Sequence, residues 1–286
     1  DDGAPLATRT FEVARAYRNM KGSGVPVRIP AIEMVEIGAG GGSIASIDSM
    51  GRLAVGPQSA GSDPGPACYD LGGAEPTVTD ADVMLGKIDP ALFAGGNVKL
   101  SPDKAGAVVE AKIGGAMGLS APLAAYAVAE IVDENMANAA RVHAIEWGKD
   151  ISERAMIAFG GAAPLHAARL AEKLGLDRVI VPSGAGVGSA VGFLRAPISY
   201  EVVRSRYMRL DGFDAAGANE LLDTMSDEAR TVVKSGAPGA ELDETRVAYM
   251  RYVGQGHEIT TPLPDRPLTP KDAPMLREAF DTAYRS

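Results

Sequence analysis

The chain has 286 residues, a hydrophobic fraction of 46% and a formal net charge of −9. The length predicts about two domains or one large two-lobed domain, and the hydrophobic fraction is that of a globular protein. The acidic balance argues against nucleic acid as a partner, and no apolar run approaches the roughly 20 residues of a membrane span.

Cysteine and histidine usage narrows the chemistry further. The only cysteine, Cys68, excludes an internal disulfide bond and suits a cytoplasmic protein. The three histidines lie far apart in the sequence, so no zinc-type ligand spacing exists.

The first thirty residues indicate extended segments joined by turns. Residues 1–3 are typical of a hairpin turn, and Thr8–Val13 is predicted to be the strand that returns from it. A glycine-containing turn at residues 22–24 then leads to a second extended piece, Val25–Ile29. Because the chain begins on a turn and without Met, we expect it to be part of a longer polypeptide.

A glycine-rich loop follows, from Gly38 to Ser43, and leads into a predicted strand at Ser43–Ile47. Glycine lets a backbone approach a ligand closely because no Cβ stands in the way. The same composition is equally typical of a hairpin turn that binds nothing.

The next stretch is stiff and polar. Prolines and glycines shape the loop Ser59–Tyr69, which is a plausible binding surface. Cys68 is a candidate nucleophile there, although a buried structural cysteine is the commoner case. Asp80 precedes an apolar run and is a candidate N-cap of a helix, or a residue that holds Mg²⁺ through water or binds substrate.

Two helices are predicted in the middle of the chain. Ser101-Pro102 is typical of a helix start, and this helix extends to about Met117 before Gly118. Ser120 begins a long second helix, whose apolar residues keep helical spacing as far as Gly148.

Residues 156–192 predict a strand, a glycine turn and a helix, followed by the same three elements again. The strands are Met156–Phe159 and Arg178–Pro182, and the first helix runs from about Pro164 to Gly175. This order brings backbone N–H groups and helix N-termini beside an anion, but similar turns often bind nothing. His166 is either a polar contact at a cleft or a helix-start histidine that bonds to nearby backbone.

The remainder is predicted to alternate between strand and helix. We expect a strand within Phe193–Leu210, a helix at Ala215–Ser235, a strand at Glu244–Gly254 and a last helix at Pro270–Arg285.

Several of these segments resemble the hydantoinase A / 5-oxoprolinase family. The resemblance covers nearly the whole chain, with Asp63 as a departure where a small residue is expected. The segments are IPAIEMVEIGAGGGSIASID, LAVGPQSAGSDPGPACYDLGG, PTVTDADVMLGKIDP, AFGGAAPLHAARLAEKLGLDRVIVP and GQGHEITTPLP.

The resemblance implies an α/β fold with an actin-like (ribonuclease H-like) ATPase lobe, followed by the start of a smaller α+β domain. We assign residues 1–205 to the lobe and residues 206–286 to the second domain, which we expect to continue beyond Ser286. The family's two Asp-x-Gly-Gly-Thr phosphate loops have no match here, so we expect them upstream of Asp1 and expect the 286 residues alone to be inactive.

The implied function is ATP-dependent opening of a cyclic amide, such as a hydantoin, N-methylhydantoin or 5-oxoproline, through a phosphorylated intermediate. A ketone carboxylase subunit of the acetone or acetophenone type is the alternative, and a non-catalytic lobe that holds a partner subunit is a third hypothesis. The implied cofactors are ATP and Mg²⁺. The implied partners are a hydantoinase B-type subunit or domain and further copies in an oligomer.

The family's nucleotide contacts carry over onto matching positions of this chain, in the two glycine turns after the strands and in the loop Gly38–Ser43, which we expect to face one cleft. The cofactor-binding candidates are Gly160, Gly161, Ala162, Gly184, Gly186, Gly40, Gly41 and Gly42. The catalytic candidates are Asp80, Asp82 and His166. No protein ligand of a metal is assigned.

Overall fold

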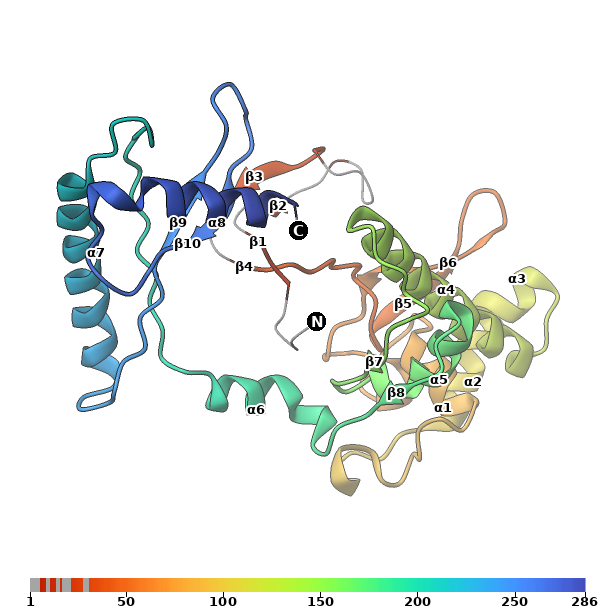
Figure 1. Cartoon of the computed structure of the whole chain (residues 1–286). Coiled ribbons are helices and arrows are strands. Elements are labelled where there is room, and N and C mark those ends of the chain that lie inside the picture. Colours follow the sequence, from red (N-terminus) through yellow and green to blue (C-terminus); the bar gives the residue numbers. More distant parts are fainter. Residues whose placement is uncertain (1–5, 9–10, 14–15, 17–21, 28–30, 286) are drawn as a thin grey trace. The chain divides into compact units, whose positions relative to one another are not determined.

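The computed structural model describes residues 6–8, 11–13, 16, 22–27 and 31–285. The chain divides into two compact units, residues 1–194 and 195–286 (Figure 1). The mixed α/β composition expected from the sequence is confirmed. Among the described residues, the strands associate as two-stranded pairs.

The N-terminal strands pair antiparallel in two short ladders. Strand β1 (Ala7–Thr8) pairs with β4 (Ala31–Ile32), and β2 (Phe11–Val13) pairs with β3 (Val25–Val27). The described parts of Thr8–Val13 and Val25–Ile29 include strands, as predicted, but Thr8 and Phe11–Val13 belong to two different pairs and not to one returning strand. The turn predicted at residues 1–3 lies outside the described residues.

A hairpin follows the glycine-rich loop, and its first strand is the one predicted there. It consists of β5 (Ser43–Ile47) and β6 (Leu53–Ser59), with a bulge between Ser43 and Ala45. In the connecting turn, one oxygen of the Asp48 carboxylate accepts hydrogen bonds from the amides of Met50 and Arg52. These bonds satisfy the backbone donors that a tight turn leaves unpaired.

Helices pack against this hairpin. Helix α1 spans Val78–Met84, and α2 (Pro102–Val109) continues through a π-helical turn at Glu110–Gly114 into α3 (Gly115–Met117). Helix α4 spans Ala121–Glu146. The predicted ends at Gly118 and Gly148 are confirmed, and both glycines have a positive φ that suits the end of a helix.

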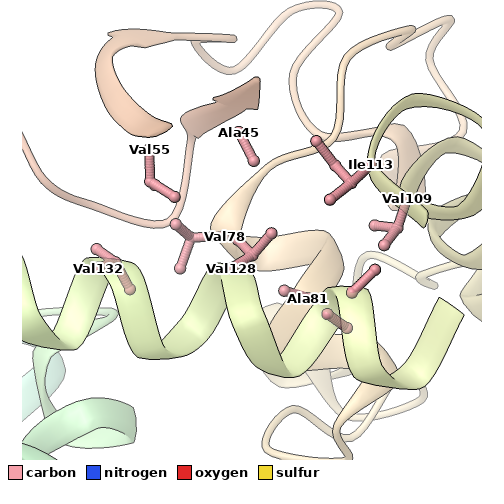
Figure 2. Packing of buried hydrophobic residues seen from close by; sticks show 10 residues of the cluster. Ala45, Val55, Val78, Ala81, Val109, Ile113, Val128 and Val132 are labelled. Carbon is pink, nitrogen blue, oxygen red and sulfur yellow. The ribbon is translucent and has the colours of Figure 1, made fainter. Parts of the chain in front are cut away.

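The core of the first unit lies between α4, α1 and the β5–β6 hairpin (Figure 2). Val128 and Val132 of α4 meet Val78 of α1, with Ala45 and Val55 on the hairpin side. Each buried valine contributes roughly 1.5–3 kcal/mol to folding relative to an exposed one. The position of α1, and of the carboxylates on it, is therefore fixed by packing.

No single helix among the described residues is long and apolar enough to cross a membrane. Two helical segments joined by a sharp bend, Pro102–Met117 and Ala121–Glu146, are together long and apolar enough to span a membrane by length and composition alone. Val109 and Val128 of this pair are buried in the protein core.

The predicted strand–helix–strand unit is present as a parallel pair. Strands β7 (Met156–Ile157) and β8 (Val179–Ile180) flank α5 (Ala163–Leu174). The strands are shorter than predicted, and α5 ends at Gly175, which has a φ of 68°. Helix α5 packs against α4, which places its first turn beside the core.

The second unit is a small α+β arrangement. Helix α7 spans Ala215–Gly236, β9 (Val247–Met250) pairs antiparallel with β10 (Ile259–Pro262), and α8 (Ala273–Arg285) packs on β10. The Asn219 side chain joins α7 to the segment before α8, because its amide both donates to and accepts from the Leu268 backbone, at 2.8 Å each.

The strand predicted within Phe193–Leu210 is wrong. Helix α6 (Gly188–Arg195) covers the start of that segment, and residues 196–209 form neither helix nor strand. The helix ends where it does because Ala196 precedes Pro197, and a residue before proline is disfavoured in helical conformation. The boundary between the two units falls at this point.

Candidate functional site

Two glycine turns lie together at the carboxyl ends of β7 and β8. The Gly160 amide donates a hydrogen bond of 2.7 Å to the carbonyl of Ala185, which ties the first turn to the second. Gly160 has a φ of 101° and Gly184 one of 75°, conformations that favour glycine. Ligands of α/β proteins characteristically bind at such carboxyl ends. We call residues 160–162 with 184–186 the glycine edge.

The glycine edge is open on its outer side. A Cβ atom added to Gly160, Gly161 or Gly186 would meet no atom within 4 Å. Gly161 also lines an open pocket of about 350 Å³ together with Lys87, Phe93 and Leu165. The missing side chain at Gly161 is therefore not required by the protein's own packing.

In the loop Gly38–Ser43, unlike the glycine edge, two glycines are closely packed against other residues. A Cβ on Gly41 would lie 2.5 Å from Thr79 Oγ1, and one on Gly42 would lie 2.8 Å from Ser59 Oγ. The carbonyl of Gly41 also accepts a 2.8 Å hydrogen bond from the Thr79 amide. Internal packing thus accounts for Gly41 and Gly42 without a ligand. Gly40 has open space around it, and its contact with a nucleotide stays a prediction.

Asp80 joins the start of α1 to the turn at Ala67–Tyr69 through hydrogen bonds with backbone amides. Thr77, rather than Asp80, is the N-cap of α1, and the two side chains form a capping box. The Asp80 carboxylate accepts hydrogen bonds from the amides of Ala67, Cys68 and Thr77 and from the Thr77 hydroxyl, at 2.7–3.2 Å. These four donors account for a fully buried carboxylate, so the catalytic role predicted for Asp80 has no support in its contacts.

Cys68 lies beside Asp80 and is completely buried. Burial, followed by the nearby Asp80 charge, raises the pKa of the Cys68 thiol far above its usual range. A raised pKa disfavours the thiolate that a nucleophilic cysteine needs. Cys68 thus has the environment of a structural cysteine.

His166 joins two carboxylates from different helices. Its Nδ1 lies 2.7 Å from Asp133 Oδ1 on α4, and its Nε2 lies 3.2 Å from Asp82 Oδ2 on α1. The side chains of Asp82, Asp133 and His166 are 1%, 2% and 4% exposed. A carboxylate can only accept, and only the imidazolium donates from both ring nitrogens. This geometry therefore favours a charged His166.

The pKa of His166 follows from these contacts. Burial opposes the charge, but the hydrogen bond with Asp133 and the contact with Asp82 outweigh it and raise the pKa to about 9. The second oxygen of Asp82 forms an ion pair of 3.2 Å with Lys87 Nζ. The four side chains together, which we call the His166 network, carry two positive and two negative charges.

Asp82 and His166 are among the candidates that the sequence indicates, whereas Asp133 and Lys87 are not. Val132 lies on the predicted apolar face of α4, and Asp133 is the next residue, at the edge of that face. A carboxylate in such a position is rarely buried without a charged partner, so it could have indicated a buried ion pair. Nothing in the sequence distinguishes Lys87 from an ordinary surface lysine.

The described residues contain no group of three or more His, Cys, Asp or Glu side chains that could hold a metal ion. Both oxygens of Asp80, the residue considered for Mg²⁺, are taken by protein donors. Asp80 therefore does not fit a magnesium ligand, and Mg²⁺ stays a prediction without a site in the described residues.

Known proteins resemble this chain over nearly its whole length. The caprolactamase subunit alpha of Pseudomonas jessenii is 35% identical over 264 residues, which cover 91% of this chain and 38% of that protein. The acetophenone carboxylase gamma subunit of Aromatoleum aromaticum is 37% identical over 270 residues, covering 90% and 36%.

Solved structures agree with these relatives. The crystal structure of the ATP-dependent caprolactamase from Pseudomonas jessenii matches with a TM-score of 0.68 and 34% identity, covering 94% of this chain and 40% of that one. The nucleotide-free structure of acetone carboxylase matches with a TM-score of 0.74 and 28% identity, covering 93% and 39%. The described fold is thus shared with these enzymes, while the assignment to an actin-like lobe stays a prediction.

The chain spans between 36% and 40% of the length of these four matches. The family model described as hydantoinase/oxoprolinase matches residues 2–202, which include the glycine edge and the His166 network. The chain belongs to the hydantoinase/oxoprolinase family.

Proposed function

We propose that this chain supplies the adenosine side of an ATP site in an enzyme that opens a cyclic amide. The observation that carries the proposal is the glycine edge, where two turns joined by the Gly160–Ala185 hydrogen bond leave open space over Gly161 and Gly186. The caprolactamase with a solved structure is named as ATP-dependent, which supports ATP as the ligand class.

The chain's own residues would act by binding and positioning. Glycine at 160, 161 and 186 lets ribose and phosphate approach the backbone closely. The N-terminus of α5, which begins at Ala163, presents backbone N–H groups and a partial positive charge to a phosphate. Bound ATP would supply a phosphoryl group that converts the amide oxygen into a good leaving group, and positioning would be the protein's main contribution.

A ketone carboxylase is the second candidate. The acetophenone carboxylase gamma subunit and the acetone carboxylase structure match this chain about as well as the caprolactamase does. ATP turnover by the full-length protein, measured with lactams, 5-oxoproline or hydantoin and separately with acetone or acetophenone plus bicarbonate, separates the two. We expect cyclic amides to stimulate turnover.

The assembly is part of the same proposal. Two of the relatives are named as an alpha and a gamma subunit. We propose a hydantoinase B-type subunit or domain as partner, further copies in an oligomer, Mg²⁺ with the nucleotide, and a cytoplasmic location. If every substrate class fails to stimulate ATP turnover in the reconstituted assembly, the non-catalytic role as a lobe that holds a partner becomes the better account.

The test of the nucleotide site is Gly161→Val in the full-length protein. The branched side chain would enter space that no protein atom occupies, so the thermal unfolding temperature should not fall. ATP affinity measured by calorimetry should drop at least about tenfold, because the side chain excludes the nucleotide. Gly192→Val on α6 is the matched control, since a Cβ there also meets nothing within 4 Å. Equal ATP affinity in the two variants would refute the assignment.

A further inference from the structure

We propose that His166 is a positioning residue for the glycine edge: its imidazolium, held between Asp82 and Asp133, fixes the first turns of α5 and offsets the charge of these two buried carboxylates beside the start of that helix. This inference rests on the proposed nucleotide site and adds a residue that prepares it for an anion.

His166 connects the start of α5 to the buried core. His166 lies five residues after Gly161, near the N-terminus of α5, and its ring contacts one carboxylate on α1 and one on α4. Both partner helices belong to the packed core, where Val78 and Val128 meet. The imidazole thus ties the start of α5, and the turn before it, to the buried core of the unit.

The charges of Asp82 and Asp133 would also affect a phosphate bound at the glycine edge. Two buried carboxylates near a phosphate site would repel the phosphate, and repulsion is strong where water is scarce. The positive charge of His166 compensates one of these negative charges, and that of Lys87 compensates the other. Lys87 also lines the pocket that contains Gly161, so the network extends to the proposed site.

The other cationic side chains of α5 are already paired. On α5 itself, Arg169 and Lys173 bind Glu130, and Lys173 also binds Glu134, both on α4. His166 is therefore the cation through which α5 meets Asp133, and its loss leaves the network with one uncompensated negative charge.

The test compares His166→Gln with the double variant His166→Gln/Asp133→Asn in the full-length protein, by calorimetric titration with Mg·ATP at pH 7. The single variant should bind ATP about tenfold more weakly, because one carboxylate loses its counter-charge. The double variant removes that carboxylate charge and should recover affinity to within about threefold of wild type. A residue with a merely structural role would not be rescued by a second buried substitution.

Two results would overturn the inference: wild-type affinity in His166→Gln, or a double variant that binds no better than the single one. Gly161→Val separates this failure from failure of the proposed function. If Gly161→Val loses affinity while His166→Gln keeps it, the nucleotide site stands and the role of His166 is wrong. If Gly161→Val keeps full affinity, the proposed function fails, and the inference fails with it.

A measurement on unaltered protein covers the case in which a variant does not fold. Between pH 7 and pH 10 the wild-type affinity for ATP should fall by about tenfold, because His166 loses its proton and no longer offsets the charge beside it. Lys87, the other cation of the network, is unchanged in wild type and variants, so the pH profile of the double variant, where it folds, reports the contribution of Lys87. A pH-independent wild-type affinity over this range would overturn the inference.

Discussion

Asp80 and Asp82 lie two residues apart on α1 and are both buried, but they bind different kinds of partner. Residues two apart on a helix do not face each other, so the two carboxylates point into different surroundings. Asp80 accepts hydrogen bonds from three backbone amides and a hydroxyl of the segment before α1, and it lies beside the neutral Cys68 thiol. Asp82 meets the charged groups of His166 and Lys87.

The difference shows how burial alone fails to identify a functional carboxylate. The donors around Asp80 are fixed in number and cannot change their protonation, so the group is a rigid support for the Ala67–Tyr69 turn. Of the two cations at Asp82, His166 has a pKa of about 9, and Lys87 lines the pocket that contains Gly161. Chemistry with a ligand is therefore expected on the Asp82 side.

The largest expected effect comes from Asp80→Asn. The new amide group would turn N–H donors toward the amides of Ala67, Cys68 or Thr77, which need an acceptor. We expect a loss of about 2–4 kcal/mol in the free energy of unfolding, from buried donors left without partners. Urea denaturation followed by circular dichroism measures this loss.

Asp82→Asn is the same substitution at the second of the two carboxylates. Its amide can donate to a neutral His166 while its oxygen still faces Lys87, so we expect a loss of about 1 kcal/mol. A larger loss for Asp82→Asn than for Asp80→Asn would reverse the roles assigned to the two carboxylates.

The next effect is a pH dependence of stability that belongs to His166. Its pKa rises from 6.5 to about 9 in the folded chain. The stabilisation is therefore complete below pH 6.5, declines as the pH rises through about 9, and amounts to roughly 3 kcal/mol. Urea midpoints measured from pH 6 to pH 10 should show this decline in wild type and lack it in His166→Gln. Parallel curves for the two proteins would contradict a charged His166.

The smallest effect is expected at the edge of the same helix pair. Glu130 on α4 binds Arg169 and Lys173 on α5, at 2.7–3.0 Å, and the hydrogen bond with Arg169 is the main reason that the Glu130 pKa falls to about 2. Because this ion pair is partly exposed and screened by water, Glu130→Gln should cost about 0.5 kcal/mol. The cost should shrink further in 1 M salt. A salt-independent cost above about 2 kcal/mol would show that α4 and α5 are held together at this surface instead of at His166.

Much of the fold could be predicted from local patterns. The ends of α4 and α5 follow from Gly148 and Gly175, and the β5–β6 hairpin follows from alternation and a turn at residues 48–51. The segment Phe193–Leu210 was mispredicted because its apolar residues suit either a strand or a helix, and Pro197 was not used to end the helix. Local periodicity does not distinguish the two in short segments.

The candidate site could be predicted only in part. His166 and Asp82 stood out as polar residues beside recognisable turns, but their pairing depends on contacts between residues 84 positions apart, which no local pattern reveals. The same limit explains why Gly41, packed against Thr79, was grouped with Gly161, whose surroundings are open. Whether a glycine serves packing or a ligand is decided by what surrounds it in space.

The most direct test of the account is hydrogen–deuterium exchange of the full-length protein with and without saturating Mg·ATP. With ATP bound, exchange should slow in peptides that cover Gly160–Ala162 and Gly184–Gly186, the two turns joined by the Gly160–Ala185 hydrogen bond. The peptide around Asp80 and Cys68, which is already held by buried bonds, should not change. Protection of neither glycine turn while ATP is bound would contradict the account and place the nucleotide elsewhere.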